Sequence, residues 1–228
     1  MDRQGWLPLL VCLAAVGSAS WTSTIDQPWA KPETDWTREE CLRILTNSPW
    51  VAKDTTTQVV GGVGSGVQGE KEIFSTYYVR LFSARPVRRA YRRLLELQTG
   101  DSASGEDSAG EDTLFRDWIV ISVTFRCNNP REQARIEQFF QTGTTETMKN
   151  RAYLTTPRHP RVPLAEYFPP QNPLVGAKFV FPRLVDGEPI VGEGDSFLVF
   201  EFDTPVEGPQ MRIRFDLETL RINGRVEL

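Results

Sequence analysis

Residues 36–50, which read WTREECLRILTNSPW, decide the fold of the first half of this chain. Thr37 suits the N-cap of a helix, and Glu40 stands three residues later, where it completes a capping box. Asn47 suits the left-handed conformation that closes many helices. Pro49 prevents continuation, because the residue before a proline is driven out of the α region. The stretch therefore predicts a helix of about three turns with a tryptophan at each end.

The apolar side chains of this stretch recur at helical spacing. They are Cys41, Leu42, Ile44 and Leu45. At 3.6 residues per turn they share one face, which must be buried against other apolar surface. The segments that follow have strand character, so we expect the helix to pack on a sheet.

The same stretch carries a family resemblance. The pattern WTREE…ILTNSPW is similar to one found near the start of uncharacterised exported bacterial proteins, and Phe181–Arg183 (FPR) is a weaker point of similarity. No activity is established for that group. The resemblance therefore implies export.

Residues 1–20 are typical of a secretory signal peptide. Arg3 precedes an apolar run over residues 6–16, and small residues at 17–20 offer a cleavage region. The run is too short to span a membrane, which takes about 20 apolar residues. We therefore expect no transmembrane anchor. The polar, proline-marked residues 21–35 predict an extended lead-in.

About 208 residues remain after such a signal, enough for a single domain over residues 36–228. The formal net charge of the chain is −4. Proteins built to bind nucleic acid are usually markedly basic, so this balance excludes a nucleic-acid partner. Residues 99–112 are rich in Gly and Ser and hold five carboxylates, a composition that predicts a disordered acidic loop.

The remainder alternates between strand and helix patterns, with most strands near the end. Helices are expected from Pro86 to about Gln98 and from Pro130 to about Gln141. The main expected strands are 55–60, 73–84, 118–127, 152–155, 177–181, 196–203, 211–217 and 220–228. Asp186-Gly187 and Asn223-Gly224 are strong hairpin turns. The proline-dense connector 156–173 is expected to be irregular or partly polyproline.

Together these elements predict an α+β fold: a mainly antiparallel, twisted sheet with about three helices, on one side of it. A sandwich and a partly closed barrel are both compatible with the pattern. If the strands at 196–203 and 211–217 pair, core matching places Phe202 opposite Met211 and Phe200 opposite Ile213. That register places Glu201 opposite Arg212.

Four arginines stand out on the helix after Pro86. They are Arg88, Arg89, Arg92 and Arg93. Like charges one turn apart cost a few tenths of a kcal/mol per pair unless something anionic offsets them. One interpretation is a binding site for an anionic ligand. The other is a solvated face that Glu96 and the acidic loop partly neutralise.

Residues 64–69 match the pattern GxGxxG. A dinucleotide site needs this turn to open a helix, whose N-terminus meets the pyrophosphate. Here it leads into a β-branched, aromatic segment. We therefore interpret it as a hairpin loop, and no cofactor is expected.

Catalytic patterns are sparse. His159 is the only histidine, it stands between Arg158 and Pro160, and no GxSxG motif occurs. One histidine with scattered cysteines offers no metal site. Glu201 and Asp203 lie two residues apart on one strand face, so they are the candidate carboxylate pair of a hydrolase. They equally suit an ordinary polar outer face.

Cys41 and Cys127 remain after signal removal, and both project from apolar faces. An even count in an exported chain favours a disulfide, whereas burial favours two free thiols that act as small hydrophobes. Both outcomes stay open.

The sequence favours an exported cell-envelope binding or interaction module without catalytic activity, with an envelope protein or an anionic ligand as partner. The alternative is a hydrolase that acts on envelope polymers or peptides. A binding module predicts an apolar or aromatic groove. A hydrolase predicts a cleft with two close titratable groups. The oligomeric state has no signal in the sequence.

Overall fold

A computed structural model describes residues 27–60, 71–100, 115–205 and 210–228. The expected signal peptide, most of the acidic loop and the GxGxxG segment lie outside these ranges. Within them, the helix after the first tryptophan is α1, Arg38–Thr46. The capping box is confirmed, since the Glu40 amide donates to the Thr37 hydroxyl and the Thr37 amide donates to the Glu40 carboxylate. Trp36 and Trp50 are both buried.

The end of α1 differs from the expectation. Asn47 has φ −150° and is not left-handed. The last carbonyls are satisfied in another way: the Asn47 amide donates to the Arg43 carbonyl, and the Ser48 hydroxyl donates to the Ile44 carbonyl. A left-handed residue is therefore not needed here.

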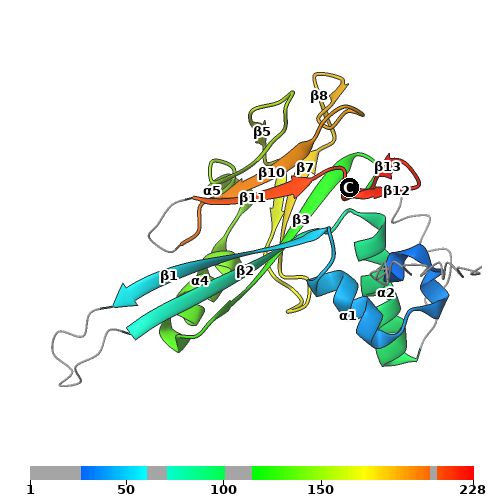
Figure 1. Cartoon of the computed structure of the whole chain (residues 1–228). Helices are drawn as coiled ribbons and strands as arrows, with labels where there is room; N and C mark the ends of the chain where they lie inside the picture. The colour runs from blue at the N-terminus through cyan, green and yellow to red at the C-terminus, as the bar shows by residue number, and fades with distance from the viewer. Residues whose placement is uncertain (1–26, 61–70, 101–114, 206–209) are drawn as a thin grey trace, which may run out of the picture.

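The strands form two antiparallel sheets and two separate hairpins (Figure 1). The five-stranded sheet has the order β1 (Val51–Val60), β2 (Lys71–Leu81), β3 (Trp118–Cys127), β7 (Ala177–Pro182), β6 (Glu166–Phe168). The four-stranded sheet has the order β11 (Met211–Asp216), β10 (Phe197–Phe202), β4 (Ala152–Thr155), β5 (Val162–Pro163). The hairpins are β8 (Leu184–Val185) with β9 (Glu188–Pro189), and β12 (Arg221–Ile222) with β13 (Arg225–Val226).

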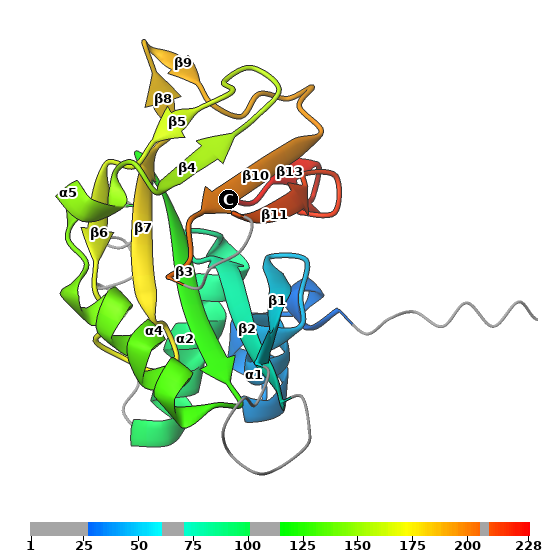
Figure 2. The same cartoon turned by 90° about the vertical axis from the view of Figure 1, so that its left-hand side faces the viewer.

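This arrangement confirms the α+β class and the antiparallel sheet. The two sheets pack face to face, and neither described sheet closes into a barrel. Phe179 of β7 contacts Phe200 and Phe202 of β10, with ring centroids 5.4 and 5.2 Å apart. Figure 2 shows the four-stranded sheet crossing the upper ends of β3 and β7.

The register between β10 and β11 is as predicted. Phe202 lies opposite Met211, and Phe200 lies opposite Ile213. Glu201 faces Arg212, whose Nε is 3.7 Å from its Oε1. The prediction that the proline-dense connector is irregular is wrong in part, because the connector contains β5 and β6. Both are edge strands, where a proline does not interrupt a ladder.

Both hairpin turns are as predicted. Asp186, Gly187, Asn223 and Gly224 all have positive φ, between 51° and 82°, as type I′ turns require. These turns aim two short hairpins at one end of the molecule, where they frame the cavity described below.

The described helices lie on both faces of the five-stranded sheet, not on one. They are α1, α2 (Arg85–Thr99), α4 (Pro130–Thr142) and the single turn α5 (Thr145–Met148). Phe140 of α4 stacks on Phe125 and Phe202, so α4 closes the space between the sheets. Arg80, whose side chain lies on the opposite face of the sheet from Val79, bonds to the Leu45 carbonyl of α1. That bond places α1 on the outer face, side by side with α2 (Figure 1).

The described part of the lead-in is not extended as expected. It forms two short 3-10 turns, Pro28–Ala30 and Glu33–Asp35, which pack against α1 and α2. Trp29 meets Trp50 edge to face, with ring centroids 5.2 Å apart. Among the described residues, no helix combines the length and apolar character needed to cross a membrane.

Candidate functional site: a groove between two hairpins

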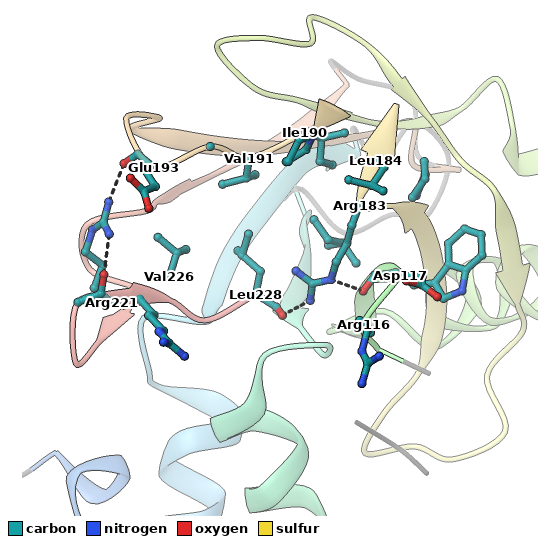
Figure 3. A pocket seen from close by; sticks show the side chains of 17 residues that line it. Arg116, Asp117, Arg183, Leu184, Ile190, Val191, Glu193, Arg221, Val226 and Leu228 are labelled. Atoms are coloured by element: carbon teal, nitrogen blue, oxygen red, sulfur yellow. Dashed lines mark hydrogen bonds between the residues drawn. The ribbon is translucent and has the colours of Figure 1, made fainter. Parts of the chain in front are cut away.

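A groove of about 930 Å³ lies at one end of the molecule. Four separate segments line it: the start of β3, the end of β7, the β8–β9 hairpin with the loop after it, and the β12–β13 hairpin with Leu228. Figure 3 shows these side chains facing one another across the cavity. We call it the hairpin groove.

The hairpin groove is lined largely by apolar side chains. They are Trp118, Ile119, Pro182, Leu184, Pro189, Ile190, Val191, Val226 and Leu228. Trp118 and Leu184 are 39% and 55% exposed, which is unusual for such large apolar residues. Exposed apolar side chains gathered around a concavity are typical of a binding site.

The charge of the groove is opposite to that of the whole chain. Its lining holds four arginines and two acidic side chains, together with Leu228, the last residue, in a protein of net charge −4. Arg221 is paired with Glu218 at 2.9 Å and donates to the Glu193 carbonyl. In contrast, the exposed side chains of Arg116 and Arg225 have no ion pair or hydrogen bond with any residue that the structure describes.

Arg183 holds the centre of the groove together. Its Nε donates to the carbonyl oxygens of Phe115, at 3.0 Å, and Trp118, at 3.1 Å, and its Nη2 donates to the Leu228 carbonyl. Burial lowers the pKa of this guanidinium, and the nearby charge of Arg88 lowers it further. Arg183 belongs to the FPR stretch. It joins the start of β3, the end of β7 and the last residues into one floor (Figure 3).

The outer wall of the groove is held by Asp195. Its carboxylate accepts from the Gly192 amide at 2.7 Å and from Arg158 Nε at 3.2 Å. A Cβ at Gly192 would lie 2.5 Å from the Arg158 guanidinium, which would have to shift to make room for it. The wall is thus fixed by a buried carboxylate and not by packing alone.

A smaller cavity of about 330 Å³ adjoins the hairpin groove, and we call it the arginine cavity. The two share Arg116, Arg183, Val226 and Leu228. The other residues that line the arginine cavity are Ser83, Arg85, Arg88, Phe115 and Glu227. Arg88 donates to the Ser83 carbonyl at 3.1 Å, and its guanidinium lies 4.6 Å from the centroid of the Phe115 ring.

Of the four arginines predicted as an anion site, Arg88 lines the arginine cavity, and the other three line neither of the two cavities described here. The other three bind the lead-in. Arg89 and Arg92 each contact a different oxygen of Glu33 at 3.0 Å. Arg93 donates to the Thr34 carbonyl at 3.0 Å and pairs with Glu96 at 3.2 Å. The sequence interpretation missed Glu33, which lies more than fifty residues earlier in the chain.

The carboxylate pair is held in a polar network on the outer face of the four-stranded sheet. Glu201, only 8% exposed, accepts from the Tyr153 hydroxyl at 2.8 Å and from Thr155 at 3.1 Å. Hydrogen bonding to Glu201 is the main cause of the raised pKa of Tyr153. Asp203 accepts from Gln210 at 2.8 Å. Neither carboxylate lines the hairpin groove or the arginine cavity.

The candidate disulfide is absent, because Cys41 and Cys127 are both free. Cys41 is on α1, which bonds to Arg80, whereas Cys127 lies opposite Ser75 on β2. Five residues along a strand separate those two points by about 16 Å. The helix therefore packs over the wrong end and the wrong face of the sheet for a bridge. Burial raises the pKa of the Cys41 thiol to about 11.

His159 has no catalytic partner in the described residues. Its backbone closes a turn with Thr156, and no hydrogen bond to its ring is found there. Within those same ranges no group of three or more His, Cys, Asp or Glu residues is placed to hold a metal ion.

Sequence reasoning missed the hairpin groove because its residues come from four segments that are far apart in the chain. Two signals pointed toward it: the Asp-Gly and Asn-Gly turns and the FPR stretch. Comparisons with protein-family models, with curated proteins and with solved structures found no match for this chain.

Proposed function

We propose that this protein is an exported binding module without catalytic activity, and that it holds an anionic ligand in the hairpin groove. The observation that carries the proposal is a cavity of about 930 Å³ in which apolar side chains surround an excess of arginines. A cavity near the upper end of the size range for small-molecule sites, in which apolar side chains are combined with charged groups, suits a ligand.

The charge of the groove supports a negatively charged ligand. Arg116 and Arg225 line the groove with exposed guanidinium groups, and neither is neutralised by a described residue. The rest of the acidic chain repels anions, so an anion gains most by binding here. Arg183 contributes a preformed floor, because its guanidinium is already fixed by three carbonyl oxygens.

The alternative function, a hydrolase, has weaker support. It rested on Glu201 and Asp203, and both carboxylates accept hydrogen bonds from neighbouring side chains on a sheet face outside the groove. The network explains these residues as a structural feature of the four-stranded sheet. Export rests on the pattern of residues 1–20 and on the family resemblance.

The experiment is native mass spectrometry of the protein purified from its natural source. We expect a retained small molecule that carries negative charge, and we expect Arg225→Glu to lower its occupancy at least about tenfold, since an attraction becomes a repulsion. Arg126→Glu is the matched control, because Arg126 is exposed on β3 and lines neither cavity. A protein that carries no ligand, or one retained equally by Arg225→Glu, refutes the proposal.

Export is tested separately by the intact mass of the exported protein, which we expect to begin between about residues 18 and 22. A mass that includes residues 1–16 refutes export and leaves the binding proposal standing.

A further inference from the structure

The arm formed by β1 and β2 carries one edge of the five-stranded sheet. β1 is the outermost strand at that edge, and it pairs with β2 over residues 51–60 without a break in register. Figure 1 shows the arm reaching away from α1 and α2. Proteins usually protect a long edge strand with a proline, a bulge or a covering segment, because unpaired main-chain groups can bind another strand. β1 contains neither proline nor bulge.

The hydrogen bonds at the base of the arm show which main-chain groups face outward. The Leu81 amide donates to the Trp50 carbonyl at 2.9 Å, so these two facing residues form a hydrogen-bonded pair. Because an antiparallel ladder alternates, every second residue from Val51 onward turns its N–H and C=O away from β2. The Val51 amide agrees with this, since it donates to the Ser48 carbonyl. The outward-facing residues after it are Lys53, Thr55, Thr57 and Val59.

These outward-facing groups form an open edge. None of the four residues has a main-chain hydrogen bond on its outward side within the described ranges, and all four are exposed. β11 comes near β1 but does not pair with it. The other edge of the arm is closed beyond the end of β3, because the Asn128 side chain accepts from the Phe74 amide at 2.9 Å and donates to the Glu72 carbonyl at 3.1 Å.

We propose that two copies of this protein pair through β1, antiparallel and about a two-fold axis at Thr57. This register places Thr57 opposite its counterpart in the second copy, and Thr55 opposite Val59 in both directions. Outward-facing residues then meet only outward-facing residues, so about six main-chain hydrogen bonds form between the copies. Such a two-fold contact uses the same surface on both subunits.

The side chains of the open edge suit a copy of themselves. Residues 55–60 read TTTQVV, so the pairing brings no like charges together, although the whole chain has a net charge of −4. Facing threonine and valine residues are favourable cross-strand neighbours. Val59 is 57% exposed and Phe74 is 40% exposed, and both lie on the face of Thr57, which is opposite Phe74. A second strand beside β1 therefore shields apolar surface as well as main-chain groups.

The experiment is sedimentation equilibrium of the purified protein between about 10 µM and about 1 mM, where we expect a monomer–dimer equilibrium. Thr57→Pro removes an outward-facing N–H, and the β1–β2 ladder tolerates it because that N–H does not bond to β2. We expect this variant to raise the dissociation constant of the dimer at least about tenfold. Thr57→Ser, the matched control, keeps the N–H and should stay within about threefold of the parent.

Opposite charges at position 57 test the register. Thr57→Lys and Thr57→Glu each place like charges face to face across the axis, so each alone should dimerise at least about threefold more weakly than the parent. An equal mixture of the two should recover the dimer, because opposite charges then meet. Glu166→Lys changes an exposed charge on β6, at the opposite edge of the same sheet, and should leave the dimer unchanged.

A protein that stays monomeric up to about 1 mM overturns the proposal. A dimer that Thr57→Pro leaves unchanged uses another surface and overturns it as well. If both charge variants weaken the dimer and their mixture does not recover it, the two-fold register at Thr57 is wrong. None of these measurements involves the hairpin groove, so the proposed function stands or falls separately.

Discussion

The guanidinium of Arg80 on β2 donates a hydrogen bond from Nε to the carbonyl oxygen of Leu45 at 2.6 Å, at the last turn of α1. Its Nη1 donates to the Thr124 hydroxyl at 3.0 Å. Arg80 is 5% exposed, and burial lowers its pKa to about 10. A cation at the C-terminal end of a helix is favoured by the helix dipole, so this one side chain fixes α1 to the outer face of the sheet.

We expect Arg80→Met to lower the free energy of unfolding by about 1–3 kcal/mol, because it strands the Leu45 carbonyl and the Thr124 hydroxyl without their donor. Chemical denaturation measures the change. Arg126→Met is the control, since its side chain is exposed on the neighbouring strand, and it should stay within about 0.5 kcal/mol of the parent. Equal stability of the two variants contradicts this role for Arg80.

Acid should weaken the start of α1 through Glu40. Its ion pair with Lys31, at 2.6 Å, and its capping bond to Thr37 lower the pKa of Glu40 from 4.5 to about 2. A carboxyl group whose pKa is lower in the folded protein than in the unfolded chain stabilises the fold fully at pH values above the unfolded pKa. That contribution is lost as the pH falls from about 4.5 through about 2.

We expect Glu40→Gln to cost about 1 kcal/mol at pH 7, because solvent screens the exposed Lys31 partner. The variant should also lose the part of the acid dependence between those two pH values, measured by urea denaturation across the range. Glu39→Gln, in the same helical turn without the capping bond, serves as control. An unchanged pH profile in Glu40→Gln would refute the assignment.

Glu33 should hold the lead-in on α2. Its two oxygens contact Arg89 and Arg92. Exposed pairs are weak, so we expect Glu33→Gln to cost only about 0.5–1 kcal/mol in global stability. Hydrogen exchange over residues 28–36 should nevertheless become faster, because local release needs less energy than unfolding. Asp35→Asn, which removes no ion pair with a described residue, should leave the exchange unchanged. An equal effect of the two variants would contradict this role for Glu33.

The two described cysteines should react at different rates. Cys41 is fully buried, and burial raises the pKa of its thiol to about 11, whereas Cys127 is half-buried. The thiolate is the reactive form, so at pH 8 we expect Cys41 to react with a thiol reagent at least about tenfold more slowly than Cys127. Peptide mapping by mass spectrometry measures both rates. Both thiols should be free in the denatured, unreduced protein, and a bridged pair there contradicts the structure.

The sequence by itself determined the features that depend on neighbouring residues. The capping box of α1, the two type I′ turns, the span of β3 and the register of Glu201 against Arg212 follow from spacing over a few residues or across one tight connection. In these cases backbone sterics, capping and the two-residue period of a strand leave one solution, because a slip by one residue would expose an apolar face.

Only the tertiary structure decided which residues far apart in the chain contact one another. The buried face of α2 shows this: Ala90 and Leu94 are buried, whereas Leu95 next to them is 37% exposed. Glu33 meets Arg89 and Arg92, Cys41 and Cys127 lie apart, and Arg183 meets Leu228 at the floor of the groove. The periods of helices and strands say which face of an element is apolar. Which elements share that face depends on how the two sheets and the helices pack, and no local pattern encodes that.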